Sequence, residues 1–231
     1  GSEYLSLWFA EGTSYPGQDN LRARKAFFEQ SLKELHQSIG PKQTMLVEYK
    51  PFEPAFYATD IADWGMAYIL AKKAGPRAKV LVDTGHHYVA QNIEQIVAWL
   101  LDEDMLGGFH FNDRRYADDD LTLGSIDPYQ VFRIFHEIHS FAAERGRPPK
   151  IAYMIDQSHN VTDPIESLMA SAVEIQRAFV QASLIDRELL EAAQSGSDVM
   201  MGHRLVKQAY VTDVSPILAE ARRRKGGAID P

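Results

Sequence analysis

The chain of 231 residues contains no cysteine. This absence excludes a disulfide framework and catalysis by a cysteine nucleophile, and it fits a reducing compartment such as the cytoplasm. Long apolar runs are missing too, since none approaches the roughly 20 residues that cross a bilayer, and no signal peptide is visible. We therefore predict a cytoplasmic protein.

Positive charge is scarce in this sequence. Lys and Arg number 24 against 32 Asp and Glu, which gives a formal net charge of −8. The one dense basic run, residues 222–225, lies near the C-terminus and is explained by an exposed helix end. Because an acidic chain is a poor partner for nucleic acid or an anionic membrane, we expect a small-molecule partner.

What the chain does contain is an alternation of strand and helix patterns. Short apolar segments rich in Val, Ile and Leu are typical of buried parallel strands, and segments with apolar residues at helical spacing follow them. The predicted strands cover residues 4–10, 44–50, 79–84, 107–112 and 150–156. The predicted helices cover residues 20–39, 60–74, 89–102, 128–145 and 164–184, followed by 186–194, 199–208 and 216–225. Asp127 and Asp163 each precede a proline, which predicts an N-cap before the first helical turn.

This rhythm predicts an α/β fold with a parallel sheet. A complete (β/α)8 TIM barrel needs eight strands and about 250 residues, whereas five strands are visible here. We therefore expect residues 1–184 to form about the last five β/α units of such a barrel, carrying the metal site, and residues 185–231 to form a C-terminal helical extension. The first three strands would lie upstream of residue 1. An open, doubly wound sheet is the competing architecture.

Four of the predicted strands end in a residue that can bind a metal ion. These residues are Glu48, Asp83, His110 and Asp156. Because the C-terminal ends of neighbouring barrel strands surround one mouth, we expect the four side chains to converge. Three carboxylates and an imidazole gathered in one place require a cation. Taken by itself, His110 could be a histidine buried in the core. The prediction of a metal enzyme therefore rests on all four strand-end residues together.

Three more candidate ligands lie in loops. His86 follows Asp83 by three residues and could reach the same ion. Asp118 and Asp120 would share one side of an extended loop, with Asp119 pointing away; a solvated acidic loop is the alternative. Seven ligands exceed one octahedral ion once water and substrate are counted, so we expect two ions that share a carboxylate. Carboxylate and imidazole ligands favour Mn²⁺, Mg²⁺ or Co²⁺.

Two residues near the same mouth suit a sugar substrate. Lys50 lies two positions after Glu48, so both side chains would face the barrel interior. There the ammonium group could polarise a substrate oxygen, although a structural ion pair is also possible. Trp8 ends the first predicted strand, and its ring could stack on a sugar face or pack in the core.

Four segments, VEYKPFEP, LVDTGHH, GGFHFNDRRYADDDL and MIDQSHN, resemble the L-rhamnose isomerases of the broad-specificity bacterial type, relatives of xylose isomerase in fold and metal site. The resemblance runs from Trp8 to the C-terminal helices, and it covers the metal half of the site because family members are longer. It implies a homotetramer that binds two Mn²⁺ ions per active site. It implies a structural ion held by Glu48, Asp83, His110 and Asp156, and a catalytic ion held by Asp83, His86, Asp118 and Asp120.

The same resemblance implies the activity. It is that of a metal-dependent aldose–ketose isomerase interconverting L-rhamnose and L-rhamnulose, with D-allose and D-psicose as further candidates, by a metal-assisted 1,2-hydride shift. Lys50, Asp118 and Asp120 would be catalytic, while Trp8, Lys50 and His86 would contact the sugar. Two alternatives stay open. One is a two-metal phosphodiesterase or nuclease on a related barrel, for which a basic groove would be expected, and the other is an inactive, metal-binding barrel fragment.

Overall fold

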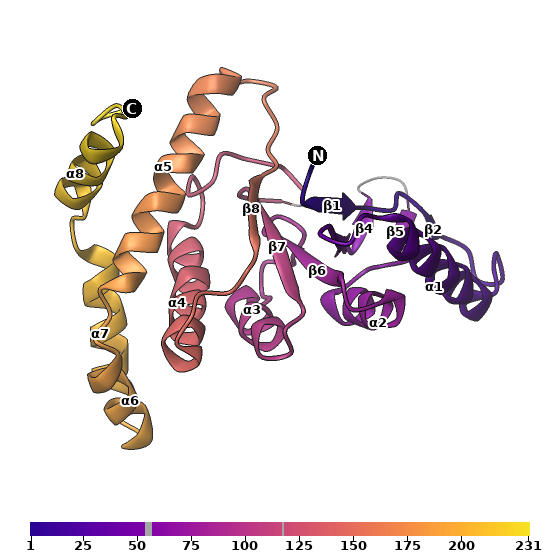
Figure 1. Cartoon of the computed structure of the whole chain (residues 1–231), viewed down its shortest axis with the longest axis horizontal. Coiled ribbons are helices and arrows are strands. Elements are labelled where there is room, and N and C mark those ends of the chain that lie inside the picture. Colours follow the sequence, from indigo (N-terminus) through magenta and orange to yellow (C-terminus); the bar gives the residue numbers. More distant parts are fainter. Residues whose placement is uncertain (54–56, 117) are drawn as a thin grey trace. The chain divides into compact units, whose positions relative to one another are not determined.

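The computed structural model describes residues 1–53, 57–116 and 118–231, and it has a mixed α/β architecture (Figure 1). The strands are β1 (Tyr4–Leu7), β2 (Gly12–Thr13), β3 (Thr44–Glu48), β4 (Phe52–Glu53), β5 (Tyr57–Thr59), β6 (Ala78–Asp83), β7 (Leu106–Phe111) and β8 (Ala152–Ile155). The helices are α1 (Leu21–Ser38), α2 (Trp64–Ala74), α3 (Ile93–Asp102), α4 (Pro128–Arg145), α5 (Pro164–Ser183), α6 (Arg187–Ser195), α7 (Val199–Val211) and α8 (Ser215–Lys225). The segments that carry the resemblance include Pro54 and Ala117, which lie outside the described residues.

The five predicted strands form one parallel sheet in the order β1-β3-β6-β7-β8. The parallel sheet and the eight predicted helices are confirmed, and the arrangement is consistent with part of a TIM barrel. Two helices begin later than predicted because a capping side chain fixes each start. The Asp63 carboxylate accepts a hydrogen bond from the backbone N–H of Met66 in α2, and the Asn92 side chain accepts one from Gln95 in α3.

A second, three-stranded antiparallel sheet, in the order β2-β5-β4, was not predicted. Its strands contain two or three residues each, and such short segments carry too little alternation to be recognised in a sequence. The sheet is built from the segments that follow β1 and β3, at the end of the parallel sheet where those strands finish.

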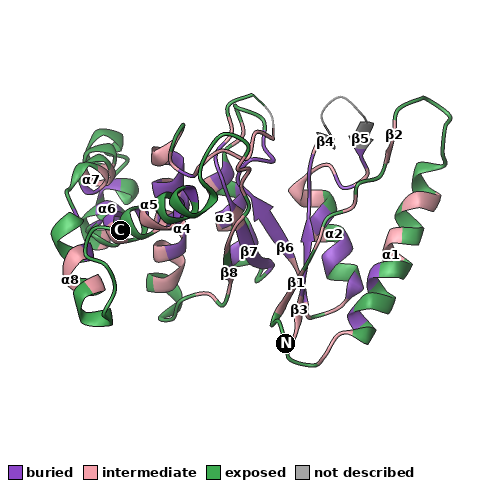
Figure 2. Cartoon of the chain, turned by 90° about the horizontal axis from the view of Figure 1, so that it is seen from above, coloured by how far each residue is buried: buried purple, intermediate pink, exposed green. Residues whose placement is uncertain are grey.

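The core of the parallel sheet is formed by β3, β6 and β7, whose residues are mostly buried (Figure 2). Helix α2 contacts β3 and β6, and α3 contacts β7. Gly107 and Gly108 allow β7 to pack closely against its surroundings. A Cβ at Gly107 would lie 2.3 Å from Cδ2 of Leu46, and one at Gly108 would lie 2.9 Å from the carbonyl oxygen of Ala152. Any larger residue at these two positions would therefore disturb the packing of β7 against Leu46 and Ala152.

The chain divides into two compact units. Residues 1–120 and 150–156 form the first, which holds both sheets and α1–α3, and residues 121–149 and 157–231 form the second, which holds α4–α8. The boundary predicted between residues 184 and 185 does not coincide with this division and stays a prediction about domain organisation. Both predicted aspartate caps are confirmed, since Asp127 accepts from Gln130 in α4 and Asp163 accepts from Ile165 in α5. Over residues 1–53, 57–116 and 118–231, no helix combines the length and apolar character needed to cross a membrane.

Candidate metal centre

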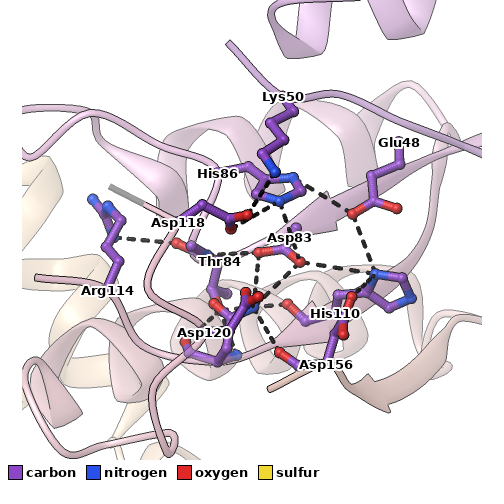
Figure 3. Close-up of polar contacts among 12 residues, drawn as sticks. Glu48, Lys50, Asp83, Thr84, His86, His110, Arg114, Asp118, Asp120 and Asp156 are labelled. Carbon is purple, nitrogen blue, oxygen red and sulfur yellow. Dashed lines mark hydrogen bonds and ion pairs between the residues drawn. The ribbon is translucent and has the colours of Figure 1, made fainter. Parts of the chain in front are cut away.

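The parallel sheet brings the strand-end residues together within the first compact unit. Glu48 and Asp83 are the last residues of β3 and β6, His110 lies one residue before the end of β7, and Asp156 directly follows β8. Asp83 and His110 are paired in register. Because all five strands run parallel, their C-terminal ends lie at one edge of the sheet, and Figure 3 shows the four side chains gathered there.

These four residues form the first ligand group. One nitrogen or oxygen atom from each of Glu48, Asp83, His110 and Asp156 lies within 4.8 Å of the others. Nδ1 of His110 is 3.2 Å from Oε1 of Glu48, 3.4 Å from Oδ2 of Asp156 and 3.8 Å from Oδ2 of Asp83 (Figure 3). Asp83 is fully buried, whereas the Asp156 side chain is 57% exposed. The group is therefore closed at Asp83 and open to solvent at Asp156.

Asp83 also belongs to a second ligand group, with His86 and Asp118. Nε2 of His86 lies 3.1 Å from Oδ1 of Asp118 and 3.9 Å from Oδ2 of Asp83. Nδ1 of His86 is 2.9 Å from the carbonyl oxygen of Tyr49 and can donate a proton to it. That hydrogen bond orients the ring so that Nε2 faces the two carboxylates, where its proton contacts Asp118 in the metal-free protein and would give way to an ion, as in metal-binding histidines.

The charges of the site are strongly unbalanced. Burial raises the pKa of Asp83 from 3.8 to about 6, and burial followed by the charge of Asp118 raises that of Asp120 to about 7. Burial alone would lower the pKa of His86, but the hydrogen bond to Asp118 and the nearby carboxylates raise it to about 9. Burial acts to raise the pKa of Asp118, but His86 and Lys50 hold it well below its usual range. Oxygen and imidazole ligands crowded in this way fit a divalent cation such as Mn²⁺, Mg²⁺ or Co²⁺.

A buried cation of the chain itself stands beside the second group. Nζ of Lys50 lies 2.6 Å from Oδ2 of Asp118 and 4.9 Å from the ring centre of Trp8. Lys50 is 6% exposed and Trp8 is 41% exposed. Lys50, His86 and Asp118 line a cavity of about 90 Å³ together with Arg114 and residues of the neighbouring loops. Of the three residues predicted to contact a sugar, Trp8 and Lys50 therefore lie side by side next to the second ligand group, and His86 belongs to that group.

The three consecutive aspartates have different positions. Asp118 belongs to the second ligand group, while Oδ2 of Asp119 accepts hydrogen bonds from the backbone N–H groups of Arg115 and Tyr116. Asp120 has a backbone φ of 48°, and its Oδ1 lies 3.3 Å from the side-chain nitrogen Nδ2 of Asn112. Asp120 thus approaches the centre without joining the three atoms of the second group, and its role as a ligand stays a prediction.

Several residues that support the centre were not predicted as functional. Asn112 bonds to Asp83 and Asp120, Tyr49 orients His86, and the hydroxyl group of Tyr49 lies 2.6 Å from Nε2 of the buried His87. A further hydrogen-bonding residue, Arg114, donates to the backbone carbonyl oxygens of Thr84, His87 and Tyr88. In the sequence, the only indication that these residues support the centre was that they lie close to predicted ligands in the chain.

No protein-family model matches the chain. It is 49% identical over 233 residues to a "probable sugar isomerase" of Mesorhizobium japonicum and 46% identical over 231 residues to another of Rhizobium meliloti; each comparison covers 100% of this chain and 54% of the relative. These similarities support a sugar isomerase family. The chain spans about half the length of the curated relatives it matches. Their names specify no sugar, so L-rhamnose stays a proposal.

A solved structure of a xylose isomerase domain protein from Alicyclobacillus acidocaldarius is similar with a TM-score of 0.52. The identity is 14%, and the match covers 78% of this chain and 65% of the other. At this identity the likeness concerns the fold alone, and it agrees with the α/β arrangement of a parallel sheet and helices described above.

Proposed function

We propose that this chain carries the metal-binding half of the active site of a sugar isomerase that interconverts L-rhamnose and L-rhamnulose. D-Allose and D-psicose are further candidate substrates. The observation that carries the proposal is that one fully buried carboxylate, Asp83, is shared by two ligand groups beside the buried Lys50. The names of the two relatives support the reaction class.

The ligands divide between two ions. Glu48, Asp83, His110 and Asp156 would hold the structural ion, and Asp83, His86, Asp118 and Asp120 would hold the catalytic ion, with Mn²⁺ as the first candidate. When bound, such ions polarise substrate oxygens and stabilise the negative charge that develops on them.

The side chains around the cavity would bind the substrate and transfer its proton. In an aldose–ketose conversion, the hydrogen on C2 moves to C1 while the proton of the C2 hydroxyl group reaches the oxygen on C1. Lys50 donates a hydrogen bond to the substrate oxygen nearest the carbonyl carbon. The carboxylate of Asp118 already contacts Lys50 and His86, so it positions them. Asp120 is then the carboxylate that receives the proton from the C2 hydroxyl group and returns it to the oxygen on C1, and Trp8 packs against the carbon chain of the open sugar.

The remaining parts of this proposal concern the whole protein. The five parallel strands belong to an eight-stranded barrel, which the greater length of the relatives and the fold of the xylose isomerase domain protein support. Following the resemblance of its sequence motifs, we also propose a cytoplasmic homotetramer. Light scattering on the purified full chain measures the assembly directly.

The decisive experiment is an isomerase assay with L-rhamnose and Mn²⁺, before and after EDTA treatment, on this chain and on a longer protein that supplies the remaining strands of the barrel. We expect ketose formation that EDTA abolishes and added Mn²⁺ restores. Asp118→Asn should remove turnover, whereas Asp104→Asn should not, because the Asp104 side chain is 94% exposed and its φ of 53° is one that asparagine tolerates. A near-normal rate in Asp118→Asn would contradict the proposed role. Nicking of plasmid DNA by the same preparation, without sugar turnover, would favour a two-metal nuclease instead.

A further inference from the structure

We propose that Asn112 is a positioning residue that holds the carboxylates of Asp83 and Asp120 in the geometry that binds divalent ions. The inference rests on the metal-dependent function proposed for this site. It concerns a residue between the predicted ligands His110 and Asp118, beyond the end of β7, which is not itself a ligand.

The amide nitrogen of Asn112 faces four oxygen atoms. Nδ2 lies 3.1 Å and 3.3 Å from Oδ1 and Oδ2 of Asp83, and 3.3 Å from Oδ1 of Asp120. It also lies 2.8 Å from the backbone carbonyl oxygen of Asp156. All four partners accept hydrogen bonds, so the NH2 group and not the carbonyl oxygen must point toward them. One donor group therefore contacts residues from both ligand groups.

The Asn112 side chain is itself held in place. It is 1% exposed, and its backbone N–H donates to Oγ1 of Thr84 at 2.9 Å, while the Thr84 hydroxyl group donates to the backbone carbonyl oxygen of Asn112 at 2.6 Å. Gly85 closes the other side, because a Cβ there would lie only 2.5 Å from Oδ1 of Asn112. The same glycine donates its N–H to Oδ1 of Asp83 at 2.7 Å. The carboxamide has little room to move away from Asp83.

A neutral donor suits this place better than a charged group. A lysine would neutralise the carboxylates that an ion needs, and an aspartate would add a further negative charge without donating a hydrogen bond. An asparagine orients the carboxylates and leaves their negative charge available. Outer residues of this kind typically change metal affinity by about 10- to 100-fold when they are replaced.

The test measures binding of Mn²⁺ alone to the full chain by isothermal titration calorimetry. Asn112→Ala removes the donor. Gly85→Ala keeps every polar group but places a methyl group 2.5 Å from Oδ1 of Asn112 and 3.3 Å from Oδ1 of Asp83, so it crowds the contact between these two side chains. Asn92→Asp is the matched control, since Asn92 caps α3 and aspartate caps a helix equally well. Circular dichroism and the unfolding midpoint of the metal-free protein report whether each variant is folded.

We expect Asn112→Ala and Gly85→Ala to raise the dissociation constant for Mn²⁺ by about 10- to 100-fold while the metal-free fold is kept, and Asn92→Asp to leave it unchanged. A folded Asn112→Ala protein that binds Mn²⁺ within threefold of the wild type would overturn the inference, because packing alone would then explain Asn112. If Asn112→Ala does not fold, the variant Asn112→Leu, which has a similar volume and no donor, decides by the same criterion. If the longer protein with the remaining barrel strands binds Mn²⁺ but converts no sugar, the proposed isomerase is refuted, while the variants still decide this inference. Absence of Mn²⁺ binding would refute both.

Discussion

Replacement of Asp83 by asparagine should stabilise the metal-free protein and abolish its response to metal. Asp83 is fully buried at the junction of the two ligand groups, and burial is the main reason that its pKa rises from 3.8 to about 6. Such a shift corresponds to about 3 kcal/mol against the charged side chain. An asparagine keeps the shape and one acceptor oxygen for the N–H of Gly85 but carries no charge to desolvate.

The pH dependence of this effect has a definite sign. Above about pH 6, Asp83 is charged in both the folded and the unfolded protein, so the full penalty acts on the wild type. Below about pH 4 it is protonated in both states and the penalty disappears. The advantage of Asp83→Asn should therefore approach 3 kcal/mol at pH 8, which is about 6–12 °C in unfolding midpoint for a protein of this size, and it should vanish near pH 4.

Thermal unfolding at pH 8 and pH 4, with and without Mn²⁺, measures both effects. Wild-type protein should gain about 2.7 kcal/mol at a Mn²⁺ concentration 100 times the dissociation constant, whereas Asp83→Asn should gain almost nothing. Asp104→Asn serves as the exposed control. The reasoning is refuted if metal-free Asp83→Asn is less stable than the wild type at pH 8, or if Mn²⁺ stabilises both proteins equally.

Three further predictions concern other contacts. Lys50→Met should lower kcat for L-rhamnose by at least about 100-fold, while its affinity for Mn²⁺, measured by calorimetry, stays within a few fold of the wild type. If kcat and Mn²⁺ affinity are lost together, Lys50 organises the ligands instead. Arg114→Lys cannot reproduce three guanidinium bonds to the loop of residues 84–88, so hydrogen exchange should become faster in that loop and stay unchanged elsewhere; unchanged protection there would contradict this. Burial and the neighbouring Arg187 lower the pKa of His136 to about 4, so the unfolded chain takes up a proton first as pH falls. The unfolding free energy of the wild type relative to that of His136→Asn should therefore fall from pH 6.5 to pH 4, because the contribution of Asp83 is common to both proteins; equal pH profiles would contradict this.

The sequence predicted the parallel sheet well because buried parallel strands are short, apolar and followed by helices with clear spacing. It also predicted the first ligand group, since a charged residue at the end of an apolar strand is conspicuous. The predicted first residues of two helices were less accurate. Near Asp63 and Asn92, other polar residues could also cap a helix, and a sequence does not show which of them does so. The antiparallel sheet of β2, β4 and β5 was missed because its strands contain only two or three residues and because β2 pairs with β5, which is distant in the chain.

The supporting residues of the centre show the limit of pattern reasoning. Asn112 follows a predicted strand, as many loop asparagines do, and only the folded structure shows its amide nitrogen between two carboxylates. Tyr49 acts on His86 through its backbone carbonyl group, which every residue type possesses. Asp118 and Asp120 were predicted to be equivalent, but the left-handed backbone at Asp120 separates their positions. Contacts made by backbone atoms or by local backbone conformation leave no residue-specific trace in one sequence.

Side chains alternate in direction over residues 48–50, at the end of β3. The number of residues in this strand therefore matters more for the site than the side chain of Tyr49 does. Glu48 and Lys50 reach the ligand groups, while the Tyr49 side chain between them reaches His87. Deleting one residue upstream in β3 would turn the Tyr49 side chain toward the carboxylates. It would also turn Glu48 and Lys50 away from them, to the opposite face of the strand. A phenylalanine at position 49 would lose one hydrogen bond, whereas a one-residue deletion would dismantle the site altogether.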